Sequence, residues 1–109
     1  MADILKVKKT DEFNNFLSEN ENVIVKFSAE WCGPCRTMTN VINNLNDDAL
    51  NGVSFVEVDV DEDDFADVIS DLSIRNLPTF IFFKNNEVKD RKVGTLQANE
   101  IIDFVKNNV

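Results

Sequence analysis

A chain of 109 residues is long enough for one domain with a substantial hydrophobic core, and short for two. Its 20 acidic and 11 basic side chains leave a net charge of −9, which argues against a nucleic-acid backbone as the partner. The hydrophobic fraction of 43% is ordinary for a globular protein, and apolar runs such as residues 80–83 are far too short to span a bilayer. We therefore expect a single domain over residues 1–109 that binds neither nucleic acid nor membrane.

The N-terminal residues and the low cysteine content indicate where the protein works. Residues 1–6 contain no basic segment followed by a long apolar run, so they do not resemble a signal peptide. We expect a cytoplasmic protein, and stable structural disulfides are rare in that compartment. The acidic run of residues 59–64 is interpreted as a solvated strand end and helix start, with a docking surface for basic partners as the alternative.

The hydrophobic pattern predicts an α/β fold with five strands and four helices. β-Branched and aromatic runs mark the strands, and apolar residues spaced three and four apart mark the helices. We expect strands at Ile4–Val7, Asn22–Phe27, Val53–Val60, Thr79–Phe83 and Val88–Val93. The first helix follows the first strand, starts at Thr10 and has Phe13, Phe16 and Leu17 on one face. The next two helices follow the second and third strands and carry Met38, Val41, Ile42 and Leu45, and then Phe65, Val68, Ile69 and Leu72, while the last helix carries Ile101, Ile102, Phe104 and Val105. Asn85 and Asn86 favour a tight hairpin between the last two strands, because asparagine tolerates positive φ. Parallel crossovers followed by a hairpin make a mixed sheet covered by helices.

Cys32 and Cys35 are the only cysteines, and they lie in the turn from a predicted buried strand into the next helix. A thiolate at a helix start is stabilised by unpaired backbone N–H groups and by the positive end of the helix dipole. Pro34 suits the first helical turn, because its missing N–H would have no partner there. This arrangement predicts that Cys32 attacks a substrate disulfide and that Cys35, one turn later, resolves the mixed disulfide.

Two other roles for the cysteine pair are open. A zinc site normally has four ligands, and without histidine or further cysteine it would have to be shared between subunits or completed by carboxylates. The cysteines could also be inert core thiols. Gly33 and Pro34 between them, with Trp31 before them, favour an exposed, rigid turn and hence redox chemistry. With no glycine-rich dinucleotide loop, we expect no bound cofactor and no metal, only a redox-active disulfide.

The segment Trp31-Cys-Gly-Pro-Cys35 is similar to the active-site motif of the thioredoxin family. Further segments follow the order and near spacing of that family, namely Phe27–Ala29, Val58–Asp61, Leu77–Phe80 and Val93–Gly94. The resemblance covers essentially the whole chain and implies the thioredoxin fold, a central mixed five-stranded sheet flanked by four helices. It also implies a protein-disulfide reductase of electron transport and cell redox homeostasis. Such a protein acts on disulfide-containing proteins and is re-reduced by an NADPH-dependent thioredoxin reductase.

The resemblance also implies a substrate site around the cysteines. Pro78 would be a cis proline facing them, and the backbone of Leu77 would hydrogen-bond an extended substrate segment in a shallow groove. That groove would be formed by Trp31, Gly33, Pro34, Leu77, Pro78, Val93 and Gly94. Without the resemblance, an ordinary trans peptide bond would be expected at Pro78, and core packing would explain Trp31 equally well.

Two positions depart from the family. Where it usually has a buried aspartate, this chain has Lys26, and a buried ammonium is strongly disfavoured unless paired, so we predict a charge-reversed pair with Glu57. A charged Lys26 would favour the thiolate and make the protein a stronger oxidant, a neutral amine would serve as a base near Cys35, and a side chain reaching solvent would do neither. Asn40 replaces a proline frequent in the family, which predicts a straighter helix.

Two alternative functions stand beside the reductase. A more oxidising disulfide oxidase or isomerase is less favoured, because such relatives often carry histidine where this chain has Pro34, and most are exported. A non-enzymatic module would use the same groove around Trp31 and Pro78 to bind a partner protein while the thiols stay idle.

Overall fold

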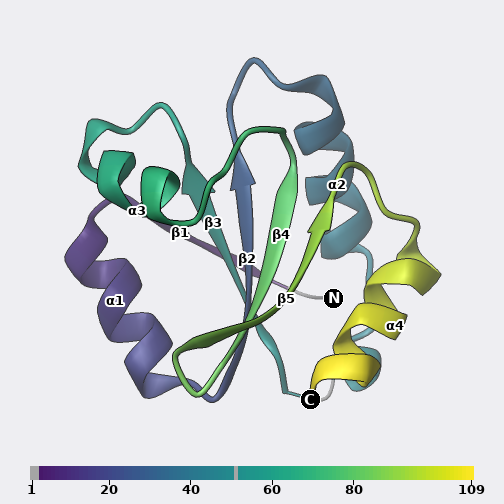
Figure 1. The fold of residues 1–109 in the computed structure, drawn as a ribbon. Helices are drawn as coiled ribbons and strands as arrows, with labels where there is room; N and C mark the ends of the chain where they lie inside the picture. The colour runs from purple at the N-terminus through teal and green to yellow at the C-terminus, as the bar shows by residue number, and fades with distance from the viewer. Residues whose placement is uncertain (1–2, 51) are drawn as a thin grey trace.

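The computed structural model describes residues 3–50 and 52–109. A five-stranded sheet in the order β1-β3-β2-β4-β5 forms its centre, with helices on both sides (Figure 1). The strands are β1 (Ile4–Val7), β2 (Asn22–Ser28), β3 (Ser54–Asp59), β4 (Thr79–Lys84) and β5 (Glu87–Val93). The helices are α1 (Thr10–Glu19), α2 (Gly33–Asn43), α3 (Ala66–Asp71) and α4 (Ala98–Asn108), with 3₁₀ turns η1 (Asp47–Leu50) and η2 (Asp63–Phe65). The predicted five strands and four helices are confirmed in number and order.

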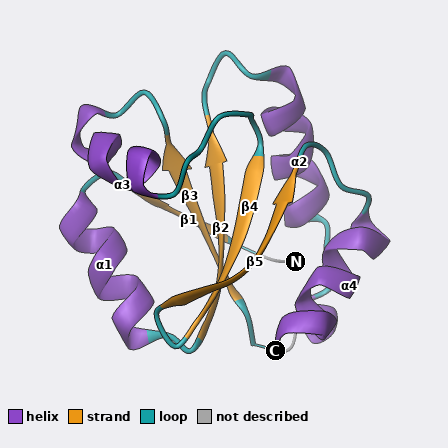
Figure 2. Ribbon diagram, viewed as in Figure 1, coloured by secondary structure: helices purple, strands orange, loops and turns teal. Residues whose placement is uncertain are grey.

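The sheet is mixed because its central strand has neighbours of both orientations. β2 runs parallel to β3 and antiparallel to β4, while β1 extends the parallel part and β5 the antiparallel part. Figure 2 shows α1 and α3 on one face and α2 and α4 on the other. β2 is therefore covered on both faces, and its residues 23–28 are all buried. Burial on both faces explains why Val23–Val25 is a continuous apolar run and does not alternate with polar residues.

Alternate side chains of the strands pack into two separate cores, as the pleat of a sheet requires. The core beneath α2 and α4 includes Ile24, Phe80, Phe82, Met38, Ile42 and Phe104. The core beneath α1 and α3 includes Val25, Phe27, Ile81, Phe13, Leu17 and Phe65. In the second core, the Phe13 ring lies edge-on to Phe65 and Phe83, each at 6.1 Å between centroids. Both cores are therefore built on the same three inner strands.

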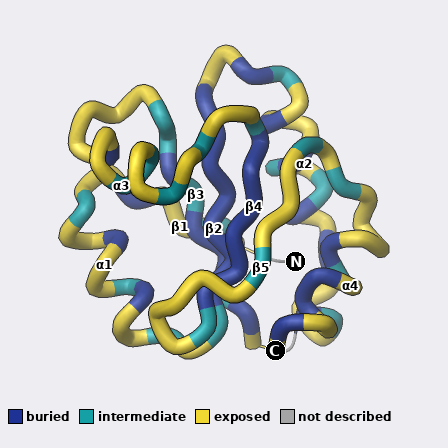
Figure 3. Tube along the Cα trace, viewed as in Figure 1, coloured by how far each residue is buried: buried dark blue, intermediate teal, exposed yellow. Residues whose placement is uncertain are grey.

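The hairpin between β4 and β5 is the one expected from its two asparagines. Asn85 and Asn86 both have positive φ, 52° and 67°, as a two-residue hairpin turn requires. β5 is the edge strand, and Figure 3 shows it largely exposed beside the buried β2 and β4. Its polar sequence suits an edge that is open to solvent.

Several boundaries differ from the sequence-based expectation. β2 and β4 each end one residue later, at Ser28 and Lys84, β5 begins one residue earlier at Glu87, and Leu72 lies one residue after α3. Leu45 lies outside α2, because the helix ends at Asn43 and the Asn44 side chain donates to Asn40 O at 2.9 Å. Asparagine competes with the helix for backbone partners, and Leu45 reaches the core from a tighter turn. β3 is shorter than the predicted Val53–Val60 by one residue at each end, and Phe65 belongs to η2, one residue before α3. Neither of the 3₁₀ turns, η1 and η2, was predicted.

Candidate active site

The turn from β2 into α2 places the cysteine pair at a helix N-terminus. Cys32 is the N-cap of α2 with extended backbone angles, φ −88° and ψ 105°, and Gly33 and Pro34 are the first two helical residues. The Cys32 N–H donates back to Ala29 O at 3.1 Å, which tightens the turn. The expected position of Cys32 at the start of the helix, with Pro34 in its first turn, is confirmed.

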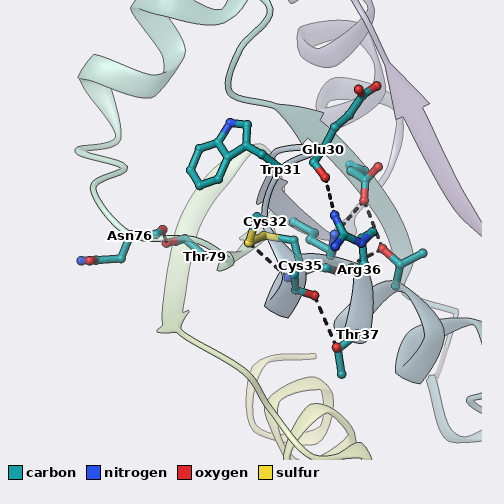
Figure 4. Close-up of a disulfide and its surroundings, with 12 residues drawn as sticks. Glu30, Trp31, Cys32, Cys35, Arg36, Thr37, Asn76 and Thr79 are labelled. Carbon is teal, nitrogen blue, oxygen red and sulfur yellow. Dashed lines mark hydrogen bonds and ion pairs between the residues drawn. A yellow bond between two sulfur atoms is a disulfide. The ribbon is translucent and has the colours of Figure 1, made fainter.

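Cys32 and Cys35 form a disulfide, with their Cα atoms 5.3 Å apart (Figure 4). The Cys35 N–H donates to Cys32 Sγ at 3.2 Å, so one of the free donors of the first helical turn points at the sulfur. After reduction, the same donor and the positive end of the helix dipole favour an anion at Cys32. The bonded pair shows that the two sulfurs lie within bonding reach of each other, which argues against the alternative of two inert core thiols.

The cysteines are less exposed than the sequence suggested. Cys32 is 5% exposed and Cys35 1% exposed in the disulfide form, and both pack with Ala29, Val60 and Leu77. The expectation of an exposed turn is correct for Trp31 and Pro34 and wrong for Cys32. Neighbouring apolar side chains, which only the fold brings together, cover the disulfide.

Trp31 stands beside the disulfide and is fixed by a residue from another loop. The side chain is 69% exposed, so the core-packing interpretation of Trp31 is wrong. Its Nε1–H donates to Asp61 Oδ2 at 2.8 Å, which holds the indole next to the cysteines. Sequence analysis named the segment that contains Asp61 and missed its role as the partner of Trp31. Figure 4 shows the disulfide between Trp31 on one side and Arg36, whose guanidinium donates to Glu30 O, on the other.

A groove of about 660 Å³ opens in front of Cys32. Four residues that the resemblance implied line it, namely Trp31, Gly33, Pro34 and Leu77. The remaining lining comes from Cys32, Val60, Ile69, Ile74, Arg75 and Asn76, and sequence analysis had assigned none of the residues 74–76 to the site. We call this space the front groove. It brings the turn of α2 together with the segment that joins α3 to β4.

The other implied groove residues lie next to the front groove without lining it. The Leu77–Pro78 peptide bond is cis, as the resemblance implied. Gly94 donates its N–H to Pro78 O at 2.8 Å, and Val93 pairs with Thr79 in the sheet. Gly94 has φ 94°, a conformation that strongly favours glycine. Pro78, Val93 and Gly94 therefore form one connected patch at the ends of β4 and β5.

The predicted ion pair behind the cysteines is present. Lys26 Nζ lies 2.7 Å from Glu57 Oε1, because the two residues are directly opposite in the parallel pairing of β2 and β3. Lys26 is 1% exposed, which contradicts the alternative in which its amine reaches solvent. Glu57 also accepts a bond from Thr39 Oγ1 at 3.5 Å and lies 3.9 Å from Lys6 Nζ. The lysine is buried and paired, and its carboxylate partner is the more exposed of the two.

A second cavity of about 610 Å³ connects this ion pair with Cys35. Its lining includes Lys26, Glu57, Thr39 and Cys35, together with charged residues at the rim. Thr39 lies between the two, and its hydroxyl is within hydrogen-bond distance of either Glu57 Oε1, at 3.5 Å, or the backbone carbonyl of Cys35, at 3.2 Å. We call this space the rear cavity. Cys32 lines only the front groove of these two spaces, and Cys35 lines only the rear cavity.

Helix α2 continues without a break from Gly33 to Asn43 and passes through Asn40. The uninterrupted helix agrees with the absence of proline at that position. Within residues 3–50 and 52–109, no group of three or more cysteine or carboxylate side chains is arranged to hold a metal ion. No helix in that part of the chain is long and apolar enough to cross a membrane.

The comparisons with known proteins agree with this fold and site. The thioredoxin family model matches residues 4–107. A thioredoxin of Rickettsia bellii is 40% identical over 87 residues, which cover 80% of this chain and 81% of that protein. A thioredoxin of Mycoplasma genitalium is 32% identical over 104 residues, covering 95% of this chain and 99% of that protein. The solution structure of oxidised thioredoxin from Plasmodium falciparum superposes with a TM-score of 0.83 at 30% identity, covering 96% of this chain and 97% of that one.

The chain belongs to the thioredoxin family. Its fold is the thioredoxin fold, and its site is a Cys32–Cys35 disulfide at the entrance of a helix. It is a thiol-disulfide oxidoreductase of the thioredoxin type, with the two cysteines as the redox-active pair.

Proposed function

We propose that this protein is a protein-disulfide reductase in which Cys32 is the nucleophile and Cys35 resolves. In the reduced protein, the Cys32 thiolate attacks one sulfur of a substrate disulfide, forms a mixed disulfide and releases the first substrate thiolate, which takes up a proton. Cys35 then loses its proton and attacks Cys32 Sγ, which releases the second substrate thiolate. Two electrons pass to the substrate, and the protein is left with the Cys32–Cys35 disulfide.

One observation carries this assignment, namely that the two cysteines line different spaces. Cys32 borders the front groove, where a substrate segment has room, and Cys35 borders the rear cavity. A thiol donated to by a helix N–H and open to the groove suits attack on an external disulfide. A thiol buried behind it suits attack on its neighbour, one helical turn away.

Substrate binding is proposed for the front groove and for the patch next to it. Trp31, Gly33 and Pro34 form one side, and the backbone of Leu77 offers hydrogen bonds to an extended segment on the other. Pro78, Val93 and Gly94 continue the surface beyond the groove. Backbone contacts recognise no particular side chain, which suits an enzyme that acts on many protein disulfides.

The Lys26–Glu57 pair is proposed to support the resolving step. Lys26 lies 2.7 Å from a carboxylate, so its positive charge is largely compensated and a paired ammonium has no lone pair to act as base. Four carboxylates line the rear cavity with Cys35, those of Glu30, Glu57, Asp59 and Glu62. Glu57 is the one paired with the buried lysine, and in this proposal it accepts the proton of Cys35 through water that enters the cavity. Lys26 holds that carboxylate in position.

The oxidised protein needs an electron donor, and we propose an NADPH-dependent thioredoxin reductase in the cytoplasm. A dithiol of that enzyme would reduce the Cys32–Cys35 disulfide by the same exchange in reverse, making the chain an electron carrier in cell redox homeostasis. No bound cofactor is needed in this chain for that exchange. Reduction of the oxidised protein by NADPH and a thioredoxin reductase, followed by the loss of NADPH absorbance, tests the partner.

Insulin reduction by dithiothreitol tests the catalytic proposal directly. We expect the wild-type protein to accelerate insulin precipitation and a Cys32→Ser, Cys35→Ser double variant to match the reaction without protein. Equal rates for wild type and double variant would contradict the proposal. A redox titration against glutathione separates a reductase from an oxidase or isomerase, which would have a clearly higher midpoint potential. Capture of partners that survives loss of both cysteines and depends on Trp31 would favour a non-enzymatic module.

A further inference from the structure

One wall of the front groove is a segment without regular secondary structure. Residues 74–77 run from the end of α3 toward β4, and all four line the groove beside Cys32. The end nearest β4 is fixed, because Thr79 Oγ1 donates to Asn76 O at 2.6 Å. The other end depends on how α3 terminates.

Helix α3 ends in a Schellman motif that has serine at the position usually taken by glycine. The Ile74 N–H donates to Ile69 O at 3.0 Å, and the Ser73 N–H donates to Ser70 O at 3.1 Å. Ser73 has φ 55°, in the left-handed region that residues with a Cβ avoid. A serine at this position weakens the end of a helix of only six residues. The cap therefore depends on contacts from outside the helix.

Arg91 of β5 makes that outside contact. Its guanidinium donates from Nη2 to Leu72 O and from Nη1 to Ser73 O, the latter at 3.3 Å. Carbonyls at a helix C-terminus lack helical partners and carry partial negative charge, so they favour a cation. Arg91 is opposite Ile81 in the sheet and therefore lies on the face that α1 and α3 cover. The planar fork of arginine bridges both carbonyls, which a lysine cannot do in the same way.

We propose that Arg91 is a positioning residue for substrate binding, since it holds the end of α3 and thereby the groove wall of residues 74–77. The proposal rests on the reductase function proposed above. Arg91 is not among the described residues that line the front groove, so its loss changes the fit of a substrate segment and leaves the chemistry of Cys32 intact. A protein substrate that lies along the wall depends on Arg91, and a small disulfide that meets only Cys32 does not.

The test compares Arg91→Ala with Lys92→Ala, which removes the same charge from the next residue, on the opposite face of β5. Reduction of insulin and of 5,5′-dithiobis(2-nitrobenzoate) is measured for both variants. We expect Arg91→Ala to raise KM for insulin about threefold to tenfold, with kcat and the rate on the small disulfide unchanged. Lys92→Ala should match the wild type. Ser73→Gly added to Arg91→Ala should lower KM again, because glycine holds the left-handed conformation unaided.

Several outcomes would overturn the proposal. An unchanged KM in Arg91→Ala would do so, as would an equal rise in Lys92→Ala. A raised KM that Ser73→Gly fails to lower would show that Arg91 acts on the substrate directly. Hydrogen exchange of the Ser73 and Ile74 amides gives a readout that needs no activity, and we expect it to quicken in Arg91→Ala alone. If the wild type reduces neither insulin nor the small disulfide, the proposed reductase function is wrong. Unchanged hydrogen exchange of the Ser73 and Ile74 amides in Arg91→Ala would independently overturn the role of Arg91.

Discussion

The two sides of the disulfide differ in shape and in polarity. In front, Cys32 borders an open groove whose walls are an exposed tryptophan, a turn and the irregular segment of residues 74–77. Behind, Cys35 borders a cavity in which Lys26 is 1% exposed and paired with Glu57. The front groove has few charges near the sulfur, and the rear cavity contains a buried ion pair.

In the proposed mechanism, this difference separates substrate recognition from proton transfer. A groove with backbone donors and acceptors binds extended chains through shape and main-chain bonds, with little demand on their sequence. In the proposed mechanism, the carboxylate paired with the buried lysine binds no substrate and takes the proton of Cys35. The disulfide lies on the boundary between the two spaces, and each cysteine faces the space that suits its step.

The largest effects are expected when either cysteine is replaced by serine, because the two cysteines face different spaces and should fail at different steps. Cys32→Ser removes the sulfur that faces the groove, so we expect no mixed disulfide and insulin reduction at the uncatalysed rate. Cys35→Ser should also stop turnover but should accumulate a mixed disulfide with substrate, because attack still occurs and release does not. Mass spectrometry of the protein after mixing with an oxidised substrate checks this. A stable mixed disulfide in Cys32→Ser and none in Cys35→Ser would reverse the assigned roles.

Removing the charge of Glu57 or of Lys26 in the rear ion pair should lower the stability of the fold by unequal amounts. Glu57→Gln leaves the ammonium of Lys26 buried without a counter-charge, and we expect the free energy of unfolding to fall by about 3 kcal/mol or more. Lys26→Met leaves a carboxylate that is already 15% exposed, so the loss should be smaller. Urea denaturation measures both, and the double variant should lie closer to the wild type than Glu57→Gln does. Additive losses in the double variant would show that the two residues do not act as a pair.

The same variants sharpen the assignment of the proton acceptor. If Glu57 takes the proton of Cys35, resolution of the mixed disulfide should slow in Glu57→Gln near neutral pH, about tenfold to a hundredfold. The rate of that step as a function of pH, measured by stopped flow, should lose its carboxylate-dependent part. Initial alkylation of Cys32 should change little, because Cys32 borders the other space. Superimposable pH profiles in wild type, Glu57→Gln and Lys26→Met would eliminate any active role of the pair.

A smaller effect is expected in the front groove at Trp31. Trp31→Ala removes one side of the groove, and we expect KM for insulin to rise about threefold to tenfold with kcat little changed. Asp61→Asn keeps an acceptor for the indole and serves as the matched control, with a rise in KM of about twofold or less. Steady-state kinetics with insulin checks both. A fall in kcat equal to the rise in KM would place Trp31 in the chemical step.

The smallest effect should come from Asp64, which belongs to neither space. The backbone N–H of Thr10 donates to the Asp64 carboxyl and lowers its pKa. Desolvation acts in the opposite direction and raises the pKa, while the Thr10 hydroxyl and the charge of Lys9 lower it further. A lowered pKa stabilises the fold above the ordinary aspartate range, and that contribution is lost as the pH falls through the lowered pKa, below about pH 4. Asp64→Asn should therefore lower Tm slightly at pH 7 and converge with the wild type in acid. Thermal melts across pH 2.5–7 measure this, and a difference that grows toward low pH would contradict it.

The helices and strands could be predicted from the sequence because local patterns decide them. The apolar spacing in α1, the β-branched run in β2 and the paired asparagines of the hairpin each specify a conformation within a few residues. Boundaries were predicted less accurately where a polar side chain competes with the backbone, as Asn44 does at the end of α2. The Lys26–Glu57 pair was predicted from the resemblance to the family, which marked both positions, and from the need of a buried lysine for a counter-charge.

Contacts between segments distant in the sequence were decided by the tertiary structure. No periodicity places Asp61 against Trp31, Arg91 against the end of α3, or apolar side chains over Cys32, since each contact depends on how separate loops meet at the ends of the strands. The sequence by itself determined the reactive pair, its helix and the order of the elements, all of which arise within short stretches of chain. Only the packed fold gave each cysteine its own space, because burial and the shape of cavities belong to the whole molecule.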